Sequence, residues 1–341
     1  MASIIETYAY ARAGLIGNPS DGYFGKTISI SVRNFRAHVL CYPSANLEIR
    51  MSTIDTPVWK SIQELREGVK LYGYYGGIRL IRAIIKRFAD YCDKKGIELP
   101  KRNFTIEYDS DIPARVGLAG SSAIITAVLR ALLDFYEIDM PKEIQPNIIL
   151  SAEQDELGIG AGLQDRVIQV YENVVYMDFD RKHLETVGHG VYEQLDPALL
   201  PNLFIAYDTR LSEGSEVFHN NIRERFNQGD PEVVNAMKQF AQFAEDAKNA
   251  LLAGEMEKLP ALMNANFDLR SSLYTLRKSD LDLVHCARKV GASSKFAGSG
   301  GAVIGTYEDE QMLQRLQEEY HQIGAELIIP QITPISELQG R

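Results

Sequence analysis

Residues that form disulfides or bind transition metals are scarce in this chain. Its 341 residues include three cysteines, Cys41, Cys92 and Cys286, and six histidines. An odd number of widely separated cysteines predicts neither a disulfide framework nor a zinc knuckle, so we expect buried thiols in a reducing compartment. His285 beside Cys286 is the nearest approach to a ligand pair, but adjacent helix positions point in different directions. The sequence therefore argues against a structural transition metal.

Long apolar runs and concentrated positive charge are also missing. No stretch approaches the roughly 20 apolar residues that cross a bilayer, and the first residues lack the basic and apolar segments of a signal peptide. Lys and Arg are dispersed in a chain of net charge −10, whereas nucleic-acid binding needs a concentrated positive face. We therefore expect a cytoplasmic protein with no membrane and no nucleic-acid partner. The sequence leaves its oligomeric state open.

The length suits two globular domains. A chain of 341 residues exceeds one ordinary hydrophobic core. Strand-like runs alternate with turns in the first third, and long helical segments follow residue 190. We expect strands at 27–32, 37–41, 46–50, 103–108, 173–179, 202–207, 302–307 and 325–330. We expect helices at 77–92, 124–136, 147–157, 231–252, 255–274, 279–290 and 308–324. The predicted domains are 1–190 and 191–341.

The segment 117–123 is the clearest candidate for phosphate binding. Glycines allow close approach of the backbone, and the start of a helix offers unpaired N–H groups and the positive end of its dipole. An ordinary serine-capped helix explains this segment equally well when it is taken alone. The segment is not the common P-loop, because no Gly-Lys-[Ser/Thr] follows. The candidate phosphate-binding residues are Gly117, Leu118, Ala119, Gly120, Ser121, Ser122 and Ala123.

Two carboxylates flank a second glycine-rich segment, 152–166. Glu153 lies near the end of a predicted helix, and Asp165 follows three glycines. Mg²⁺ takes hard oxygen ligands and often only one or two from the protein. A second carboxylate can accept or orient a hydroxyl proton. A solvated acidic helix end is the alternative, and it applies best to Asp155 and Glu156.

Two further segments are ambiguous when each is taken alone. In 11–21, a strand carrying Arg12 leads to a turn with Asn18 and Asp21, which suit hydroxyl recognition, although a polar surface turn has the same composition. The segment 295–302 is a glycine-rich turn where backbone could approach a ligand, or only a loop.

In this order and at these separations, the four segments resemble the GHMP kinases, which include galactokinase, homoserine kinase, mevalonate kinase and phosphomevalonate kinase. The resemblance extends from Arg12 to Gly301. It implies an α+β, two-domain GHMP kinase fold. Residues 1–190 would form a ribosomal-protein-like, ATP-binding domain and residues 191–341 a ferredoxin-like domain. It also implies ATP and Mg²⁺ as cofactors and a small-molecule sugar or uronic acid as substrate.

The resemblance also implies a role for each matching residue. Ser122 and Glu153 would hold Mg²⁺, and Ser121 with the neighbouring backbone would bind the ATP phosphates. Asp165 would be the catalytic carboxylate, with Arg12 as the cation beside it and beside the transferring phosphoryl group. The substrate would contact Asn18, Asp21, Asp165, Arg166, Gly298, Ser299 and Gly300.

Two departures from the common pattern narrow this resemblance within the family. The phosphate loop has one more residue between its Gly-Leu and Ser-Ser than most members, and Asn18 stands where galactokinase has Glu. Both features, and the strings at 17–21, 73–77, 120–124 and 161–166, are similar to those of glucuronokinases. This subgroup phosphorylates the anomeric hydroxyl of a sugar acid, converting D-glucuronate to D-glucuronate 1-phosphate.

Several alternatives stay open at this point. Another sugar, such as galacturonate, a galactose-type sugar or a heptose phosphate, could be the acceptor. A non-catalytic sugar or ATP sensor on the same fold should have lost Asp165, Glu153 or Ser122, and all three are present. The cation that reads a substrate carboxylate could be Arg115, Arg166, Arg210 or Lys26, although each could equally form a surface ion pair. Trp59 is a conceivable neighbour of the adenine.

Overall fold

The computed structural model describes residues 4–50, 52, 61, 76–211 and 216–332, with backbone only for 211 and 216–221. Trp59 and residues 73–75 of the string at 73–77 lie outside the described residues. Within the described parts of the chain, no helix is both long and apolar enough to span a membrane.

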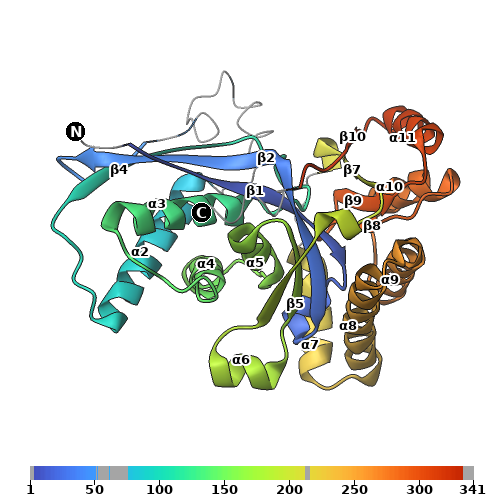
Figure 1. Ribbon diagram of the computed structural model, residues 1–341, viewed down its shortest axis with the longest axis horizontal. Helices are drawn as coiled ribbons and strands as arrows, with labels where there is room; N and C mark the ends of the chain where they lie inside the picture. The colour runs from blue at the N-terminus through green and yellow to red at the C-terminus, as the bar shows by residue number, and fades with distance from the viewer. Residues whose placement is uncertain (1–3, 51, 53–60, 62–75, 212–215, 333–341) are drawn as a thin grey trace. The chain divides into compact units, whose positions relative to one another are not determined.

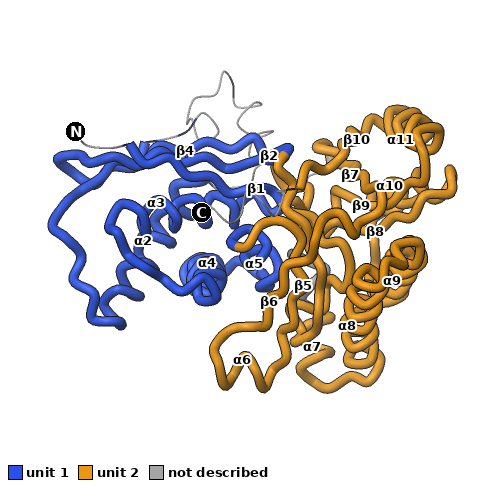
Figure 2. The backbone as a smooth tube through the Cα atoms, viewed as in Figure 1, with its two compact units in different colours: residues 1–11, 34–112, 119–170 blue, residues 12–33, 113–118, 171–341 orange. Residues whose placement is uncertain are grey.

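Two compact units interleave along the sequence (Figure 2). Unit 1 comprises residues 1–11, 34–112 and 119–170, and unit 2 comprises 12–33, 113–118 and 171–341. The segment 117–123 therefore contributes its first two residues to unit 2 and the remainder to unit 1. A boundary at residue 190 falls inside unit 2, so the division into 1–190 and 191–341 remains a prediction about family domains.

In unit 1, helices cover one face of a set of strands (Figure 1). The strands are the first part of β1 (Ile5–Ile16), the second part of β2 (Lys26–Ser44), β3 (Glu48–Ile49) and β4 (Asn103–Ser110). The helices are α2 (Gly77–Lys95), α3 (Gly120–Tyr136), α4 (Gln145–Ser151), the π-helical turn η3 (Ala152–Glu156) and α5 (Gln164–Tyr171). Strand β4 pairs antiparallel with β2 and parallel with β3, while α2 and α4 both pack against α3.

The core helix of unit 1 follows directly from its apolar spacing. Ile125, Val128 and Leu132 are fully buried in α3, and the helix ends at Tyr136 before Glu137, whose φ is 57°. The predicted helix at 147–157 is also present, as α4 continued by η3 and ended by Gly158 at φ 66°. A π-helical turn places one extra residue in the helix and often marks a functional site.

Unit 2 contains the antiparallel pairings of the first part of β2, β5 (Val174–Asp178) and β6 (Val191–Leu195), a separate four-stranded antiparallel sheet, and a group of long helices. Its elements before the four-stranded sheet are η1 (Ser20–Tyr23), the first part of β2, β5, α6 (Arg181–Val187), β6 and η4 (Pro197–Leu199). The remainder are β7 (Leu203–Tyr207), η5 (Thr209–Leu211), α7 (Glu216–Asn227), α8 (Pro231–Leu252), η6 (Met256–Lys258), α9 (Leu259–Leu273), α10 (Lys278–Lys289), β8 (Lys295–Phe296), β9 (Ala302–Thr306), α11 (Glu310–Gln322) and β10 (Glu326–Ile328).

The sheet of β7 to β10 has the strand order β10-β7-β9-β8, and all its pairings are antiparallel. With helices between β7 and β8 and between β9 and β10, the chain order is β-α-β-β-α-β, the ferredoxin-like arrangement. Phe204, Leu283, Phe296 and Tyr320 belong to the apolar core between this sheet and α10 and α11. The α+β class and the ferredoxin-like prediction are therefore confirmed.

One strand prediction was wrong. The runs at 27–32 and 37–41 are not separate strands but parts of β2, which continues from Lys26 to Ser44. Its first part pairs with β5 and its second part with β4. Arg33, Asn34 and Arg36 interrupt the apolar pattern between the two predicted strands, but this segment continues the strand because each half has its own partner.

Candidate active site

The predicted phosphate loop enters α3 through a left-handed residue. Ala119 has φ 63° and ψ 43°, occupies the N-cap position and makes no side-chain capping bond. The hydroxyl of Ser121 donates to Glu153 Oε1 at 3.2 Å, and that of Ser122 donates to the Ala119 carbonyl at 3.2 Å. Neither serine caps the helix, so the ordinary serine-capped start was the wrong alternative. The first-turn N–H groups of α3 thus resemble those that bind anions in other helices.

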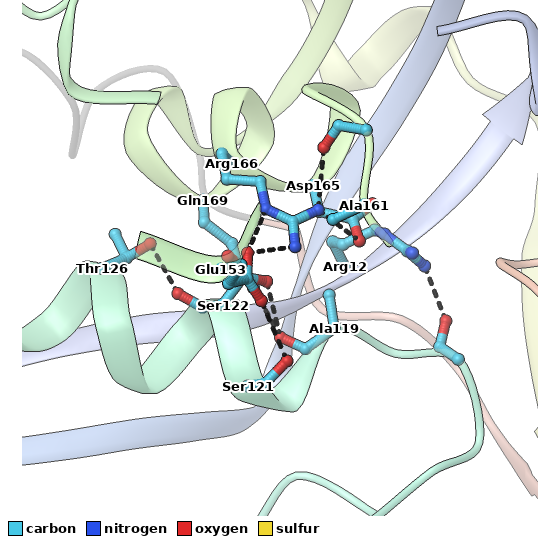
Figure 3. A network of polar contacts seen from close by, with 12 residues as sticks. Arg12, Ala119, Ser121, Ser122, Thr126, Glu153, Ala161, Asp165, Arg166 and Gln169 are labelled. Carbon is cyan, nitrogen blue, oxygen red and sulfur yellow. Dashed lines mark hydrogen bonds and ion pairs between the residues drawn. The ribbon is translucent and has the colours of Figure 1, made fainter. Parts of the chain in front are cut away.

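Glu153 lies at the centre of the unit 1 network (Figure 3). The π-helical turn η3 carries this side chain, which is fully buried. Its Oε2 accepts hydrogen bonds from Arg166 Nε at 2.6 Å and from Arg166 Nη2. Burial raises the pKa of Glu153, and the Arg166 guanidinium opposes this shift. The pair holds two buried charges in a fork-shaped contact that satisfies both.

Asp165 and Arg166 lie in the first turn of helix α5. Arg166 is buried and also donates to the Gly162 carbonyl at 2.8 Å. Asp165 lies 3.2 Å from Arg166 Nη1, and its side chain is 18% exposed, whereas that of Glu153 is inaccessible. A carboxylate in the first turn of a helix is stabilised in its charged form by the helix dipole. Of the two carboxylates, Asp165 is the more exposed.

The donor atoms of this network suit Mg²⁺ better than a transition metal. The residues described by the structure contain no group of three histidine, cysteine or acidic side chains that could hold a metal ion. Mg²⁺ usually keeps several waters and takes one or two carboxylates together with substrate phosphates. Glu153 with the hydroxyls of Ser121 and Ser122 offers only hard oxygen atoms. The residues present therefore fit a magnesium ion that arrives with a nucleotide.

Within unit 2, Arg12 connects the start of the phosphate loop to the glycine-rich turn at 298–300. Its Nη1 donates to the carbonyls of Gly117 at 2.6 Å and Ala297 at 3.0 Å, and its side chain is buried. A Cβ atom on Gly298 would lie 2.3 Å from the Gly117 carbonyl oxygen, so only glycine allows this approach. Ser299 and Gly300 continue the turn next to Gly117.

The predicted hydroxyl-binding turn also belongs to unit 2. Asn18 is buried, its Nδ2 donates to the Phe296 carbonyl at 3.5 Å, and its own carbonyl accepts from Asn266 Nδ2 at 3.1 Å. Asp21 lies in η1 and is partly exposed. The structure thus connects this turn to the segment that precedes the glycine-rich turn.

Sequence reasoning missed two buried cations that bind the backbone in and just before the glycine-rich turn at 298–300. Lys295 Nζ donates to the carbonyls of Gly14 and Phe296, both at 2.7 Å. Arg270 donates from Nη1 to the Gly298 carbonyl at 2.8 Å and from Nη2 to that of Ser299 at 3.3 Å. Burial, with the nearby guanidinium groups, lowers the pKa of Lys295 well below its usual value. The bonds to Gly14, Gly298 and Ser299 join positions far apart in the chain, so no local pattern could have indicated them.

The candidate readers of a substrate carboxylate have different surroundings. Lys26 lies 2.5 Å from Glu245 Oε2, and Arg210 lies 2.6 Å from Asp208. Arg166 binds Glu153, and Arg115 is exposed with φ 60°. Lys26, Arg210 and Arg166 are therefore already paired with carboxylates of the chain itself.

The predicted residues thus fall into two sets. Unit 1 brings together Ser121, Glu153, Asp165 and Arg166, and Ser122 lies in the same helical turn as Ser121. Unit 2 brings together Arg12, Gly117 and the turn at 298–300.

Comparison with known proteins decides the family. The model of the GHMP kinases N terminal domain matches residues 79–173. Glucuronokinase 1 of Arabidopsis thaliana is 43% identical over 337 residues, covering 97% of this chain and 92% of that protein. The chain belongs to the GHMP kinase family. A second Arabidopsis relative, probable glucuronokinase 2, is also 43% identical, over 94% of this chain and 89% of that protein.

The solved structures of this family share the fold at low sequence identity. Lactococcus lactis galactokinase complexed with galactose has a TM-score of 0.75 at 16% identity, covering 97% of this chain and 94% of that one. Methanococcus jannaschii mevalonate kinase has a TM-score of 0.70 at 18% identity, covering 98% and 99%. The predicted GHMP fold is thus confirmed. As a member of this family, the chain is an ATP-dependent phosphotransferase with an alcohol acceptor.

Proposed function

We propose that this GHMP kinase transfers the γ-phosphoryl group of ATP to the anomeric hydroxyl of D-glucuronate, giving D-glucuronate 1-phosphate. The observation that carries this proposal is the 43% identity with the two Arabidopsis glucuronokinases over nearly the whole chain. The presence of Ser122, Glu153 and Asp165 supports a catalytic protein over a silent sensor. The cytoplasmic location predicted above suits an enzyme that uses ATP.

Unit 1 supplies groups that suit phosphoryl transfer. This reaction needs mainly positioning and neutralisation of charge. The N–H groups at the start of α3 and the hydroxyl of Ser121 would bind the ATP phosphates. Ser122 and Glu153 would hold Mg²⁺, which neutralises phosphate charge when it is bound.

The two carboxylates of unit 1 suit different tasks because their environments differ. Glu153 is fully buried and bound by Arg166, so its carboxylate is fixed in place, as a ligand for Mg²⁺ would need to be. Asp165 is partly exposed at the start of α5, so it would orient the anomeric hydroxyl and accept its proton. In unit 2, Arg12 would place a positive charge beside the transferring phosphoryl group. Asn18, Asp21 and the turn at 298–300 would contact the sugar.

The substrate can be tested with a panel of reducing sugars and uronic acids. Each would be incubated with ATP and Mg²⁺, with ADP release as the rate and ³¹P NMR to identify the product. We expect glucuronate to have the highest kcat/KM and to yield a 1-phosphate. A higher kcat/KM for galacturonate or a heptose phosphate would show that this sugar, and not glucuronate, is the substrate. No turnover with any sugar would reject the sugar-kinase proposal.

The role of Asp165 can be tested with Asp165→Asn. We expect kcat to fall about 10²- to 10⁴-fold, the usual contribution of a positioned base, while ADP affinity measured by calorimetry stays unchanged. Asp155→Asn is the matched control, because Asp155 is an exposed acid of η3 that binds Arg87. Near-normal turnover in Asp165→Asn with nucleotide binding intact would show that the assignment is wrong.

A further inference from the structure

Ala119 is the residue of the predicted phosphate loop that has a positive φ without being glycine. Its backbone is left-handed, at φ 63° and ψ 43°, although it has a Cβ atom. Residues other than glycine are destabilised in this conformation because Cβ approaches the following carbonyl oxygen. The conformation persists only where surrounding contacts hold it, so the contacts of Ala119 decide the shape of the loop.

Three donors converge on the carbonyl oxygen of Ala119. They are the backbone N–H of Ala123 at 3.2 Å, the hydroxyl of Ser122 at 3.2 Å and Nε2 of Gln169 at 2.8 Å. The first two belong to the same helix turn as the loop itself. Gln169 is the donor that comes from another element, helix α5 (Figure 3).

Burial of the Gln169 side-chain amide is unfavourable unless the amide forms a hydrogen bond, and its bond is the one to Ala119. Its side chain is 1% exposed, and its Oε1 is buried without a hydrogen-bond partner in the described structure. A buried acceptor without a partner destabilises a fold, and an apolar side chain of similar size would avoid this loss. The donation to Ala119 is therefore the interaction that the polarity of Gln169 provides.

The position of Gln169 on α5 connects this bond to the proposed chemistry. Gln169 follows Asp165 by four residues, so the two lie on the same side of the helix, one turn apart. Arg166, on the same helix, reaches the loop by another route through Glu153 and Ser121. Two links thus join α5 to the phosphate loop, and only the Gln169 link uses a residue without a proposed ligand contact.

We propose that Gln169 is a positioning residue that fixes the left-handed turn of the phosphate loop relative to the helix that carries Asp165. The inference rests on the proposed function for the role of Asp165, but not for the effect on nucleotide binding. Gln169 acts through Ala119 and orients the first-turn N–H groups of α3. Its loss weakens nucleotide binding and phosphoryl transfer together and leaves the affinity for sugar unchanged.

The first test is Gln169→Met, which keeps the length of the side chain and removes its donor. We expect the Kd for ADP, measured by calorimetry without sugar, to rise roughly five- to tenfold, as for loss of one positioned hydrogen bond. The KM for ATP should rise by a similar factor, kcat should fall, and the KM for sugar should stay within twofold. Gln145→Met is the matched control, since Gln145 also donates to one carbonyl of unit 1, that of Met140.

The second test is Gln169→Glu. If Gln169 had a purely structural role, this variant and Gln169→Met would have the same effect. An ionised carboxylate cannot donate to the Ala119 carbonyl, but a protonated one can. Burial raises the pKa of such a group, so we expect kcat/KM for ATP to recover as pH falls, through an ionisation that wild type and Gln169→Met lack. If Gln169→Met does not fold, this isosteric variant carries the test alone.

Unchanged nucleotide affinity in both variants, with only a lower melting temperature, would overturn the proposal, as would a Gln169→Glu profile identical to that of wild type. Failure of the proposed function looks different. In that case wild type turns over no sugar acid, while the ADP affinity of the Gln169 variants still reports on the loop.

Discussion

The two units bury positive charge in different ways. In unit 1, the buried guanidinium of Arg166 binds the buried carboxylate of Glu153. In unit 2, Lys295 and Arg270 are equally buried, yet within the described parts of the chain they bind backbone carbonyls and no carboxylate. An ion pair neutralises both partners, whereas carbonyl dipoles solvate a charge without cancelling it.

This difference matches the task proposed for each region. The unit 1 pair leaves little net charge beside Asp165 and the start of α3, so it organises the loop without competing for phosphate. In unit 2, the cations bind the carbonyls of Phe296, Gly298 and Ser299. Because the glycines of this turn have no side chains that could hold it in place, the cations fix its backbone through direct hydrogen bonds.

The largest effect on stability should follow from removing one partner of the unit 1 pair. Glu153→Ala leaves the buried Arg166 with only the partly exposed Asp165 as a carboxylate partner, and breaking a buried pair in this way costs about 3–5 kcal/mol. Urea unfolding of both proteins measures this loss. In a double-mutant cycle, adding Arg166→Met should restore most of the stability, because the buried guanidinium is then gone and the charge that remains, on Asp165, is partly exposed. A single substitution that costs less than about 1 kcal/mol would show that the site admits water.

An intermediate effect should follow from Lys295→Met in unit 2. The carbonyls of Gly14 and Phe296 each lose a donor, and that of Phe296 keeps only the long bond from Asn18 Nδ2. An unpaired buried acceptor costs roughly 1–3 kcal/mol. The loss should be smaller than for Glu153→Ala, because the variant removes a buried charge and does not leave one unpaired. Equal losses in urea unfolding would contradict this distinction between the two units.

The same variant should also change how stability depends on pH. The pKa of Lys295 is lowered in the folded protein, so between that value and the usual lysine value the unfolded chain binds more protons. Rising pH therefore stabilises the folded state relative to the unfolded state, up to about pH 10.4, the unperturbed lysine value. We expect the stability difference between wild type and Lys295→Met to grow from neutral pH toward that limit. Arg270→Met should show no such growth, because a guanidinium stays charged.

Sequence reasoning worked where the determinant was local. The apolar spacing of α3 and the glycines before it predicted the helix and the turn that enters it, since neighbouring residues set helix periodicity and turn conformation. Sequence reasoning failed for β2, because Arg33, Asn34 and Arg36 interrupt the apolar pattern and the partners β5 and β4 are not visible in the sequence.

The internal contacts of the site were beyond local patterns. Arg166 was proposed to contact substrate, and its binding to Glu153, 13 positions away, depends on how η3 and α5 pack. Lys295 and Arg270 bind carbonyls that carry no side-chain signal. Gln169 would not have been chosen over any other glutamine of an amphipathic helix, because its role depends on one backbone oxygen of Ala119.

The smallest effect should come from exposed cations, one in each unit. Lys86 pairs with Asp90 and Glu156 in unit 1, and Lys289 pairs with Glu319 in unit 2. Solvent screens such pairs, and holding two flexible side chains together costs entropy, so exposed pairs contribute little. We expect Lys86→Ala and Lys289→Ala to unfold at the wild-type urea concentration, with no further change in about 1 M salt, where charges are screened within roughly 3 Å. A clear loss in only one variant would show that burial is not what separates the strong contacts from the weak ones.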